Sequence, residues 1–237
     1  MSLILRVDVD KPYGNASLTR SIASKLSEDY WFPDRIYKTR YLIHLAEFLG
    51  LCNKENIAGH IYFRMCTVPD EKIVELVKKG GHRIGFHAEN TRSLETFSAE
   101  WNDFEEVVSP EKVSSFSKHG SGTLKLGKQH YAPYEPEKYK DWAMELNTRF
   151  YFGNGICKSI DDLIPKNDFY PNMFWIEREY RDNSFSGFDQ LLKIAKNKDV
   201  PVLIHPCNYE RSRVVANDFK ELIKLSKENN IDWKVYE

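Results

Sequence analysis

The apolar residues of the chain fall into short segments, some with the spacing of a strand and some with that of a helix. The first segment, Leu3 to Asp10, is rich in branched residues and alternates toward its end, which predicts a strand. Residues 35–49 carry apolar side chains at helical spacing, and Gly50 stands where the end of that helix is expected. A strand, a helix with acidic residues first and lysines last, and another strand are predicted over residues 57–65, 69–77 and 83–87.

The rest of the chain continues this alternation. Helices are predicted over residues 93–107, 137–147, 187–196 and 217–228, and strands over residues 113–116, 150–152, 169–176, 200–206 and 232–236. Residues 122–136 are rich in Gly, Lys, Tyr and Pro and predict a long loop. Alternating strands and helices are typical of an α/β protein whose parallel strands are joined by right-handed crossovers. Because no repeat or linker interrupts the pattern, we expect residues 1–237 to form a single domain.

Composition and charge narrow the function classes. Hydrophobic residues make up 41% and charged residues 29%, as in ordinary globular proteins, and the net charge of -1 gives no field that attracts nucleic acid. The N-terminal apolar run is too short for a signal peptide, and no stretch approaches the roughly 20 apolar residues of a membrane span. The cysteines are scattered without a CxxC pair, as in proteins with reduced thiols. We therefore expect a cytoplasmic protein with neither a membrane span nor a nucleic-acid partner.

Two carboxylates stand at the end of the first predicted strand. Asp8 and Asp10 are two residues apart, so their side chains point to the same face of the strand. Two neighbouring carboxylates both ionise readily only when a cation or a proton lies between them. One of them could bind a divalent ion while the other acts as a base. The alternative is that both side chains cap the loop that follows the strand.

Three histidines also stand at or just after predicted strand ends. His87 and His205 end apolar strands, and His119 follows a short strand in the glycine-rich sequence SKHGSG. Since the carboxyl ends of parallel strands meet at one face of the fold, these side chains are candidates for a common site. Imidazole together with carboxylate suits zinc, and also nickel, cobalt or iron. Each histidine alone could equally have a structural role, which is the role we expect for His44 and His60. His82 directly follows the double glycine, so we expect it to be structural and exposed at the surface.

Several of these segments resemble the polysaccharide deacetylases, the NodB-like carbohydrate esterase family 4. PDEKIVELVKKGGHRIGFH, residues 69–87, is similar to the family segment in which a helix, a glycine–histidine pair and a strand lead to a metal-binding histidine. The preceding HIYFRM resembles the second strand of the family. VDVD resembles the first family motif, in which one aspartate is the base and the next binds the metal, and LIHP resembles the last motif, which ends in a catalytic histidine. The resemblance implies an irregular (β/α) barrel with mostly parallel strands.

The sequence departs from the family pattern at two places. Val9 separates the two aspartates, which are adjacent in the family. The second metal-binding histidine of the family falls four residues after the first, and Thr91 occupies that position here. Threonine is a poor zinc ligand, so another residue must complete the site if a metal is bound. We predict that His119 is this third ligand, with Glu89 and then His130 as the alternatives.

The resemblance implies a hydrolase that removes an acetyl group from an acetylated sugar or a precursor of surface-polysaccharide biosynthesis. In this prediction Asp10, His87 and His119 hold a divalent metal, with zinc expected. Asp8 is the base that deprotonates the attacking water, and protonated His205 donates a proton to the leaving group. The aromatic residues that we expect to stack on a sugar ring are Tyr13, Tyr131, Tyr134 and Trp175.

Two other functions fit the same sequence. A catalytically inactive relative that binds a glycan would explain Thr91 in place of a histidine. A hydrolase that cleaves the C–N bond of a small non-peptide amide would use nearly the same chemistry at the metal. The lack of a signal peptide argues against a cell-wall polymer, so we expect a small or oligomeric cytoplasmic carbohydrate as the substrate. The sequence makes no prediction of the oligomeric state.

Overall fold

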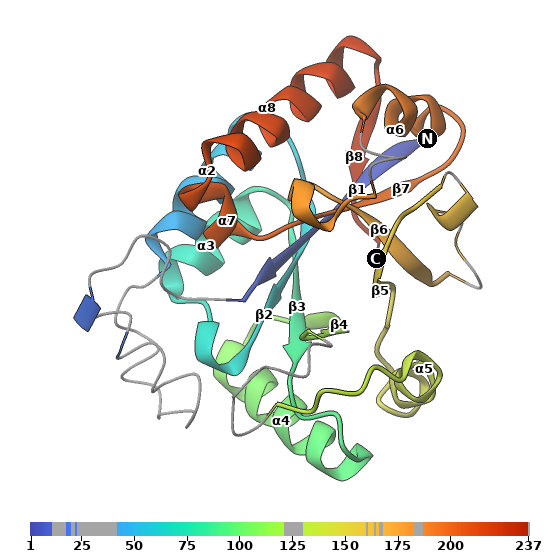
Figure 1. Cartoon of the computed structure of the whole chain (residues 1–237). Helices are drawn as coiled ribbons and strands as arrows, with labels where there is room; N and C mark the ends of the chain where they lie inside the picture. Colours follow the sequence, from blue (N-terminus) through green and yellow to red (C-terminus); the bar gives the residue numbers. More distant parts are fainter. Residues whose placement is uncertain are drawn as a thin grey trace.

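Parallel strands and the helices that connect them make up most of the described chain (Figure 1). The computed structural model describes residues 1–10, 18–19, 22, 42–120, 130–159, 161–163, 165, 168–182 and 187–236. The strands are β1 (Ser2–Val9), β2 (Gly59–Phe63), β3 (Arg83–Ala88), β4 (Val113–Lys118), β5 (Phe152–Ile156), β6 (Tyr170–Trp175), β7 (Val200–Ile204) and β8 (Asp232–Lys234). The helices are α2 (Ile43–Lys54), α3 (Glu71–Lys79), α4 (Leu94–Val108), α5 (Pro136–Glu145), α6 (Phe188–Ala195), α7 (Pro206–Arg211) and α8 (Arg213–Glu228).

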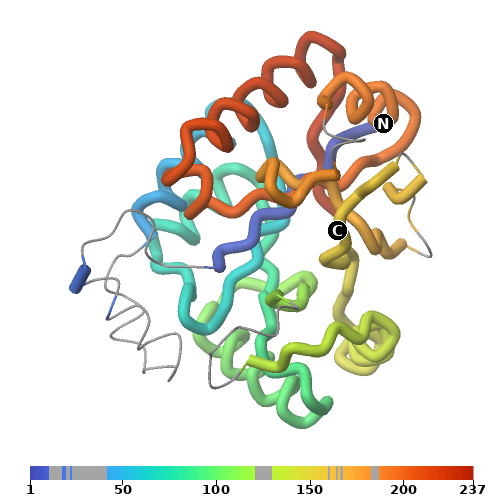
Figure 2. The backbone as a smooth tube through the Cα atoms, in the orientation of Figure 1, coloured from blue at the N-terminus to red at the C-terminus, as the bar shows by residue number. Residues whose placement is uncertain are grey.

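The sheet is parallel and strongly curled. Its strand order is β4-β3-β2-β1-β7-β6-β5, with β8 added beside the beginning of β1, and all of these pairings are parallel. Figure 2 shows β1, at the blue end of the chain, running between the cyan β2 and the red β7. The two outer strands approach each other, because Phe116 N donates to Arg149 O at 2.9 Å and Asn154 Nδ2 donates to Lys118 O at 2.7 Å. The structure thus confirms the expected irregular (β/α) barrel with mostly parallel strands.

The predicted helix signals are confirmed in α3. Asp70 caps its first turn by accepting a hydrogen bond from Ile73 N at 3.0 Å. Lysines occupy its last turn, where the helix dipole favours positive charge. Gly80 ends the helix, and Gly81 then adopts a φ of 65°, which glycine tolerates without strain. This turn leads directly into β3, so local sequence chemistry sets the position of the strand that carries His87.

The predicted end of the first helix was wrong. Helix α2 continues through Gly50 and ends at Lys54. Leu49 and Cys52, on either side of the glycine, are both fully buried. Their burial outweighs the cost of about 1 kcal/mol that glycine imposes inside a helix. The beginning of the predicted helix, residues 35–41, and residues 122–129 of the predicted loop lie outside the described residues.

The inside of the barrel changes from apolar to charged along β1. Ile4 packs in the interior against side chains of other strands, namely Tyr62, Tyr151, Phe152, Tyr170, Met173 and Leu203. The next inward residues of β1 are Arg6 and Asp8, both buried, followed by Asp10 just after the strand. The alternate residues of β1 face outward into the larger apolar core beneath the helices. The fold therefore seals the barrel at its amino end and concentrates charge toward the carboxyl ends of its strands.

Two histidines, His60 and His82, support the fold away from those carboxyl ends, and His82 is buried rather than exposed as expected. His82 Nδ1 accepts from Gly59 N at 3.0 Å, and its Nε2 is hydrogen-bonded to Asn53 Oδ1 at 2.8 Å. His60 Nε2 accepts from Tyr236 N at 3.0 Å, and His44 is buried in α2. Burial lowers the pKa of His82 to about 4 and that of His60 to about 3.

No helix in the described residues is long and apolar enough to cross a membrane. The four cysteines, all described, are buried and form no disulfide: Cys52, Cys66, Cys157 and Cys207.

The buried neutral histidines predict acid sensitivity of the fold. The pKa of His82 is near 6.5 in the unfolded chain and about 4 in the folded chain. Neutral His82 therefore makes its full contribution to the free energy of unfolding above pH 6.5, and this contribution is lost as the pH falls from 6.5 to 4. Each such group contributes a slope of about 1.4 kcal/mol per pH unit. The free energy of unfolding of His82→Asn can be measured with urea at a series of pH values. Plotted against pH, it should have a slope between pH 6.5 and 4 that is smaller by about this amount than the wild-type slope, and the same slope as the wild type above pH 7. An identical slope below pH 6.5 in the two proteins would contradict the assignment.

Candidate active site

Three histidines from the carboxyl ends of three other strands meet around Asp10. Asp10 directly follows β1, His87 lies near the end of β3, and His119 and His205 directly follow β4 and β7. Asp10 Oδ1 lies 3.0 Å from His87 Nε2 and 3.0 Å from His119 Nδ1. Asp10 Oδ2 lies 3.6 Å from His205 Nε2. The structure thus brings together all of the predicted site residues, as the topology of a parallel sheet requires.

The outer nitrogens of the two histidines near Asp10 Oδ1 face other polar side chains, and that of His87 forms a hydrogen bond. His87 Nδ1 is hydrogen-bonded to Ser117 Oγ at 2.7 Å. His119 Nε2 lies 3.7 Å from Glu89 Oε1. Histidines that ligate metals are typically oriented through their second nitrogen in this way. Each imidazole therefore points its other nitrogen toward Asp10.

Asp10, His87 and His119 form a group suited to a divalent cation. One ligand atom from each residue lies within 4.8 Å of the others. Zinc takes nitrogen and oxygen ligands at about 2.0–2.2 Å, so the ligand atoms of one ion lie at most about 4.4 Å apart. Both distances from Asp10 Oδ1, to His87 Nε2 and to His119 Nδ1, are 3.0 Å. Burial lowers the pKa of His87 despite the nearby aspartates, which favours the neutral imidazole. Burial would raise the pKa of Asp10, but His119 and His205 outweigh it and hold this pKa well below its usual value. Neutral imidazole and ionised carboxylate are the forms that bind a metal.

Asp8 lies beside this group but is bound to Arg6. Arg6 Nε donates to Asp8 Oδ1 at 2.8 Å, and Arg6 Nη2 donates to Asp8 Oδ2 at 2.7 Å. Asp8 Oδ2 is also 3.5 Å from His87 Nε2. Burial would raise the pKa of Asp8, but Arg6 and His87 outweigh it and lower this pKa. Asp8, Asp10 and His205 also offer atoms within 4.8 Å of one another, yet the bidentate contact with Arg6 makes Asp8 the poorer metal ligand.

Arg6 is a site residue that the sequence analysis did not single out. Its side chain is completely buried, and its Nη1 donates to Gly153 O at 2.8 Å. Its Nη2 also donates to Asn154 Oδ1 at 3.0 Å, so the guanidinium joins β1 to β5 across the barrel. The alternation of β1 contained the signal, since Arg6 lies two residues before Asp8 on the same face.

His205 is held by a second residue that the sequence analysis missed. Glu177, completely buried just after β6, accepts hydrogen bonds through Oε1 from both His205 N and His205 Nδ1, each at 2.9 Å. Burial would lower the pKa of His205, but Glu177 and Asp10 outweigh it and raise this pKa to about 9. The Trp175 ring stacks on the imidazole with the ring centroids 5.6 Å apart. His205 therefore favours the protonated form and presents Nε2 toward Asp10.

Two solved structures share this architecture along nearly the whole chain. The catalytic domain of a peptidoglycan N-acetylglucosamine deacetylase from Eubacterium rectale aligns with a TM-score of 0.52 and 11% identity, over 99% of this chain and 88% of that one. A probable polysaccharide deacetylase from Pseudomonas aeruginosa aligns with a TM-score of 0.56 and 11% identity, over 98% of this chain and 87% of that one. The chain has the fold of the polysaccharide deacetylases. No protein-family model and no curated protein matches the sequence.

Within this deacetylase fold, Thr91 is not part of the cluster around Asp10. It is completely buried, and its Oγ1 is hydrogen-bonded to Tyr139 OH of α5 at 3.2 Å. The position that carries a histidine in the resembling family thus serves packing here. His119 reaches the cluster instead, from the end of β4.

The geometry favours His119 over the alternative ligands. The Glu89 carboxylate forms a buried ion pair with Arg64, on the side of the His119 ring that faces away from Asp10. Arg64 also donates to the main-chain oxygen of Asp10. His130 lies farther out, with its ring centroid 6.0 Å from that of His119. Glu89 is therefore placed to orient His119 rather than to replace it.

Of the aromatic residues expected to contact a sugar, Trp175 contacts a predicted catalytic residue, His205. Tyr131 N donates to Glu89 O at 3.1 Å, which places the backbone of this residue near the cluster. Tyr134 packs against Tyr139 with ring centroids 5.9 Å apart. Tyr13 lies outside the described residues.

The Arg6–Asp8 pair predicts a non-additive pair of substitutions. Arg6→Met leaves the Asp8 carboxylate buried without its partner and should lower the free energy of unfolding by about 3–5 kcal/mol. Adding Asp8→Leu removes the uncompensated charge, so the double variant should regain a large part of this loss. Urea unfolding of the wild type, both single variants and the double variant measures the coupling. Additive losses would show that the pair does not act as a unit.

Proposed function

We propose that the protein is a metal-dependent hydrolase that removes an acetyl group from an acetylated sugar or a surface-polysaccharide precursor. The observation that carries the proposal is the position of Asp10 Oδ1, 3.0 Å from both His87 Nε2 and His119 Nδ1. The shared fold adds support, because one of the two similar structures bears the name of a peptidoglycan N-acetylglucosamine deacetylase and the other that of a probable polysaccharide deacetylase.

Asp10, His87 and His119 would hold the metal, with zinc expected from two imidazoles and one carboxylate. When bound, a divalent ion of this kind polarises the acetyl carbonyl and activates water. The protein supplies the orientation of its ligands. Ser117 fixes the ring of His87, and Glu89, itself paired with Arg64, lies behind His119.

Asp8 is the proposed general base. Its carboxylate is ionised because Arg6 and His87 lower its pKa, and Oδ2 faces the proposed ligand His87 at 3.5 Å. Arg6 binds both carboxylate oxygens, so the group cannot rotate away from the reacting water. Asp8 would take the proton of this water on Oδ2, which keeps one lone-pair direction beyond the bond to Arg6.

His205 is the proposed general acid. Glu177 holds its Nδ1–H, so the proton on Nε2 is the one available to the leaving nitrogen or oxygen of the sugar. The two candidate proton-transfer groups thus have opposite environments. Arg6 keeps Asp8 deprotonated and Glu177 keeps His205 protonated, which is the division of roles that acetyl hydrolysis needs.

The proposal predicts separate effects on metal binding and turnover. Asp10→Ala, His87→Ala and His119→Ala should each weaken zinc binding by at least about 100-fold, because each removes a proposed ligand. Asp8→Asn should bind zinc normally and lose about 10²–10⁴ in kcat, since only the base is removed. Metal content is measured by elemental analysis of protein purified without a histidine tag, and turnover by acetate release from N-acetylglucosamine oligomers.

His82→Asn is the matched control, since it removes a buried histidine far from Asp10 and should change neither metal content nor kcat. Normal zinc binding by His119→Ala would show that the third ligand is wrong, and full activity of Asp8→Asn would show that the base is wrong. Ammonia release without acetate release, from a small amide, would assign the site to a different C–N hydrolase. Stoichiometric zinc without release of either product would favour a glycan-binding role.

A further inference from the structure

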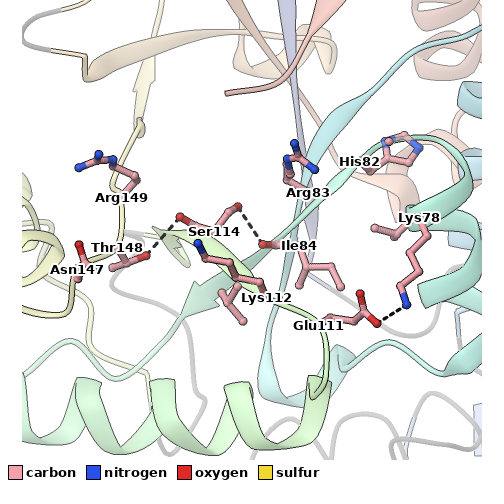
Figure 3. Close-up of a pocket in the computed structure, with 13 residues that line it drawn as sticks. Lys78, His82, Arg83, Ile84, Glu111, Lys112, Ser114, Asn147, Thr148 and Arg149 are labelled. Atoms are coloured by element: carbon pink, nitrogen blue, oxygen red, sulfur yellow. Dashed lines mark hydrogen bonds and ion pairs between the residues drawn. The ribbon is translucent and has the colours of Figure 1, made fainter. Parts of the chain in front are cut away.

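A polar groove lies at the opposite end of the barrel from Asp10. Its volume is about 680 Å³, and it is bordered by the amino ends of β3 and β4, the turn before each strand and the loop between α5 and β5 (Figure 3). We call this feature the basal groove, and the lining residues that matter below are Arg83, Glu111, Lys112, Ser114, Thr148 and Arg149. Its size is that of a site for a small ligand.

The basal groove carries unbalanced positive charge. Arg83, Lys112 and Arg149 are exposed along it, and no carboxylate among the described residues forms an ion pair with any of the three. Arg149 does hydrogen-bond Tyr151, a neutral side chain. The one acidic residue among the groove's lining residues is Glu111, and Lys78 Nζ already binds it at 2.5 Å. In a chain of net charge -1, this local excess is not a consequence of the overall composition.

The floor of the groove is shaped by an irregularity in the sheet. The β3–β4 register shifts between Ile84 and Gly85, so that Ser114 is an extra residue on β4 between the paired Val113 and Ser115. Ser114 Oγ donates to Ile84 O at 3.1 Å, and Thr148 Oγ1 donates to Ser114 O at 3.4 Å (Figure 3). Both main-chain oxygens of the floor are therefore engaged by hydroxyl groups, which reduces their repulsion of an anion.

The three unpaired cations point to phosphate. Figure 3 shows Lys112 between Arg83 on one side and Arg149 on the other, and these cationic residues come from three separate segments that line the same groove. Guanidinium groups bind phosphate oxygens in pairs, and a lysine adds a point charge between them. We propose that the basal groove is a binding site for a small ligand that carries two linked phosphate groups, one for each arginine.

This site is separate from the proposed active site. Arg83 begins β3 and His87 lies four residues further along the same strand, a distance of about 13 Å at the rise of a β-strand. The apolar interior around Ile4 fills the amino end of the barrel. The proposal therefore does not depend on the hydrolase chemistry, and either can fail without the other.

Titration calorimetry with inorganic pyrophosphate tests the proposal. Wild-type protein at low ionic strength should bind one pyrophosphate saturably, and inorganic phosphate should bind more weakly because it meets fewer of the cations. The triple variant Arg83→Gln, Lys112→Gln, Arg149→Gln should weaken pyrophosphate binding by at least about tenfold. All three side chains are exposed and form no ion pair with a described carboxylate. The hydrogen bond of Arg149 to Tyr151 is lost, so the variant should unfold within about 4 °C of the wild-type temperature.

A second triple variant, Lys196→Gln, Lys198→Gln, Lys220→Gln, removes the same charge from exposed positions elsewhere and should bind pyrophosphate as the wild type does. Equal binding by the groove variant and the wild type would overturn the proposal, including the case in which pyrophosphate binds at the proposed metal site. Equal losses in the two triple variants would overturn it too, by showing attraction to net charge alone. Absence of saturable binding to the wild type would do the same.

Discussion

The ion pair between Arg6 and Asp8 is the constraint on which the proposed site depends. Two aspartates on one face of β1 would repel each other inside a barrel, where charge is costly to bury. Arg6 offsets one of these charges with two short hydrogen bonds and is anchored on β5 by Gly153 and Asn154. One aspartate can therefore stay ionised as a base while the other faces the histidines. Without this pairing, burial would favour protonation of one carboxylate, and that carboxylate could then serve neither as the proposed base nor as the proposed metal ligand.

The remaining site residues follow the same physical scheme, in which each functional group is held by a partner behind it. Glu177 holds His205, Ser117 holds His87, and a buried Glu89 lies behind His119. These partners lie on or just after strands, so the rigid parts of the barrel fix the orientation of the cluster. The surroundings of Asp8 favour an anionic carboxylate and those of His205 a cationic imidazole, as the proposed roles of base and acid require.

Local patterns in the sequence predicted the strands, most helices and the residues at the strand ends. Asp8, Asp10, His87, His119 and His205 could be selected because parallel strands bring their carboxyl ends together, whatever the details of packing. The partners could not be selected in the same way. Glu177 contacts a residue 28 positions away, and Arg64 contacts Glu89 25 positions away, so neither pairing has a local signature. The continuation of α2 through Gly50 was missed for a similar reason, because tertiary burial of Cys52 overrides the local preference of glycine.

X-ray absorption spectroscopy of the zinc-loaded protein tests the central claim most directly, because it reports which ligand types surround the ion. The account predicts two imidazole nitrogens and carboxylate oxygen at about 2.0–2.2 Å, and one imidazole in His119→Ala at zinc concentrations high enough to load that variant. A spectrum with a single imidazole in the wild type, or one that does not change when His119 is removed, would contradict a metal centre built from Asp10, His87 and His119.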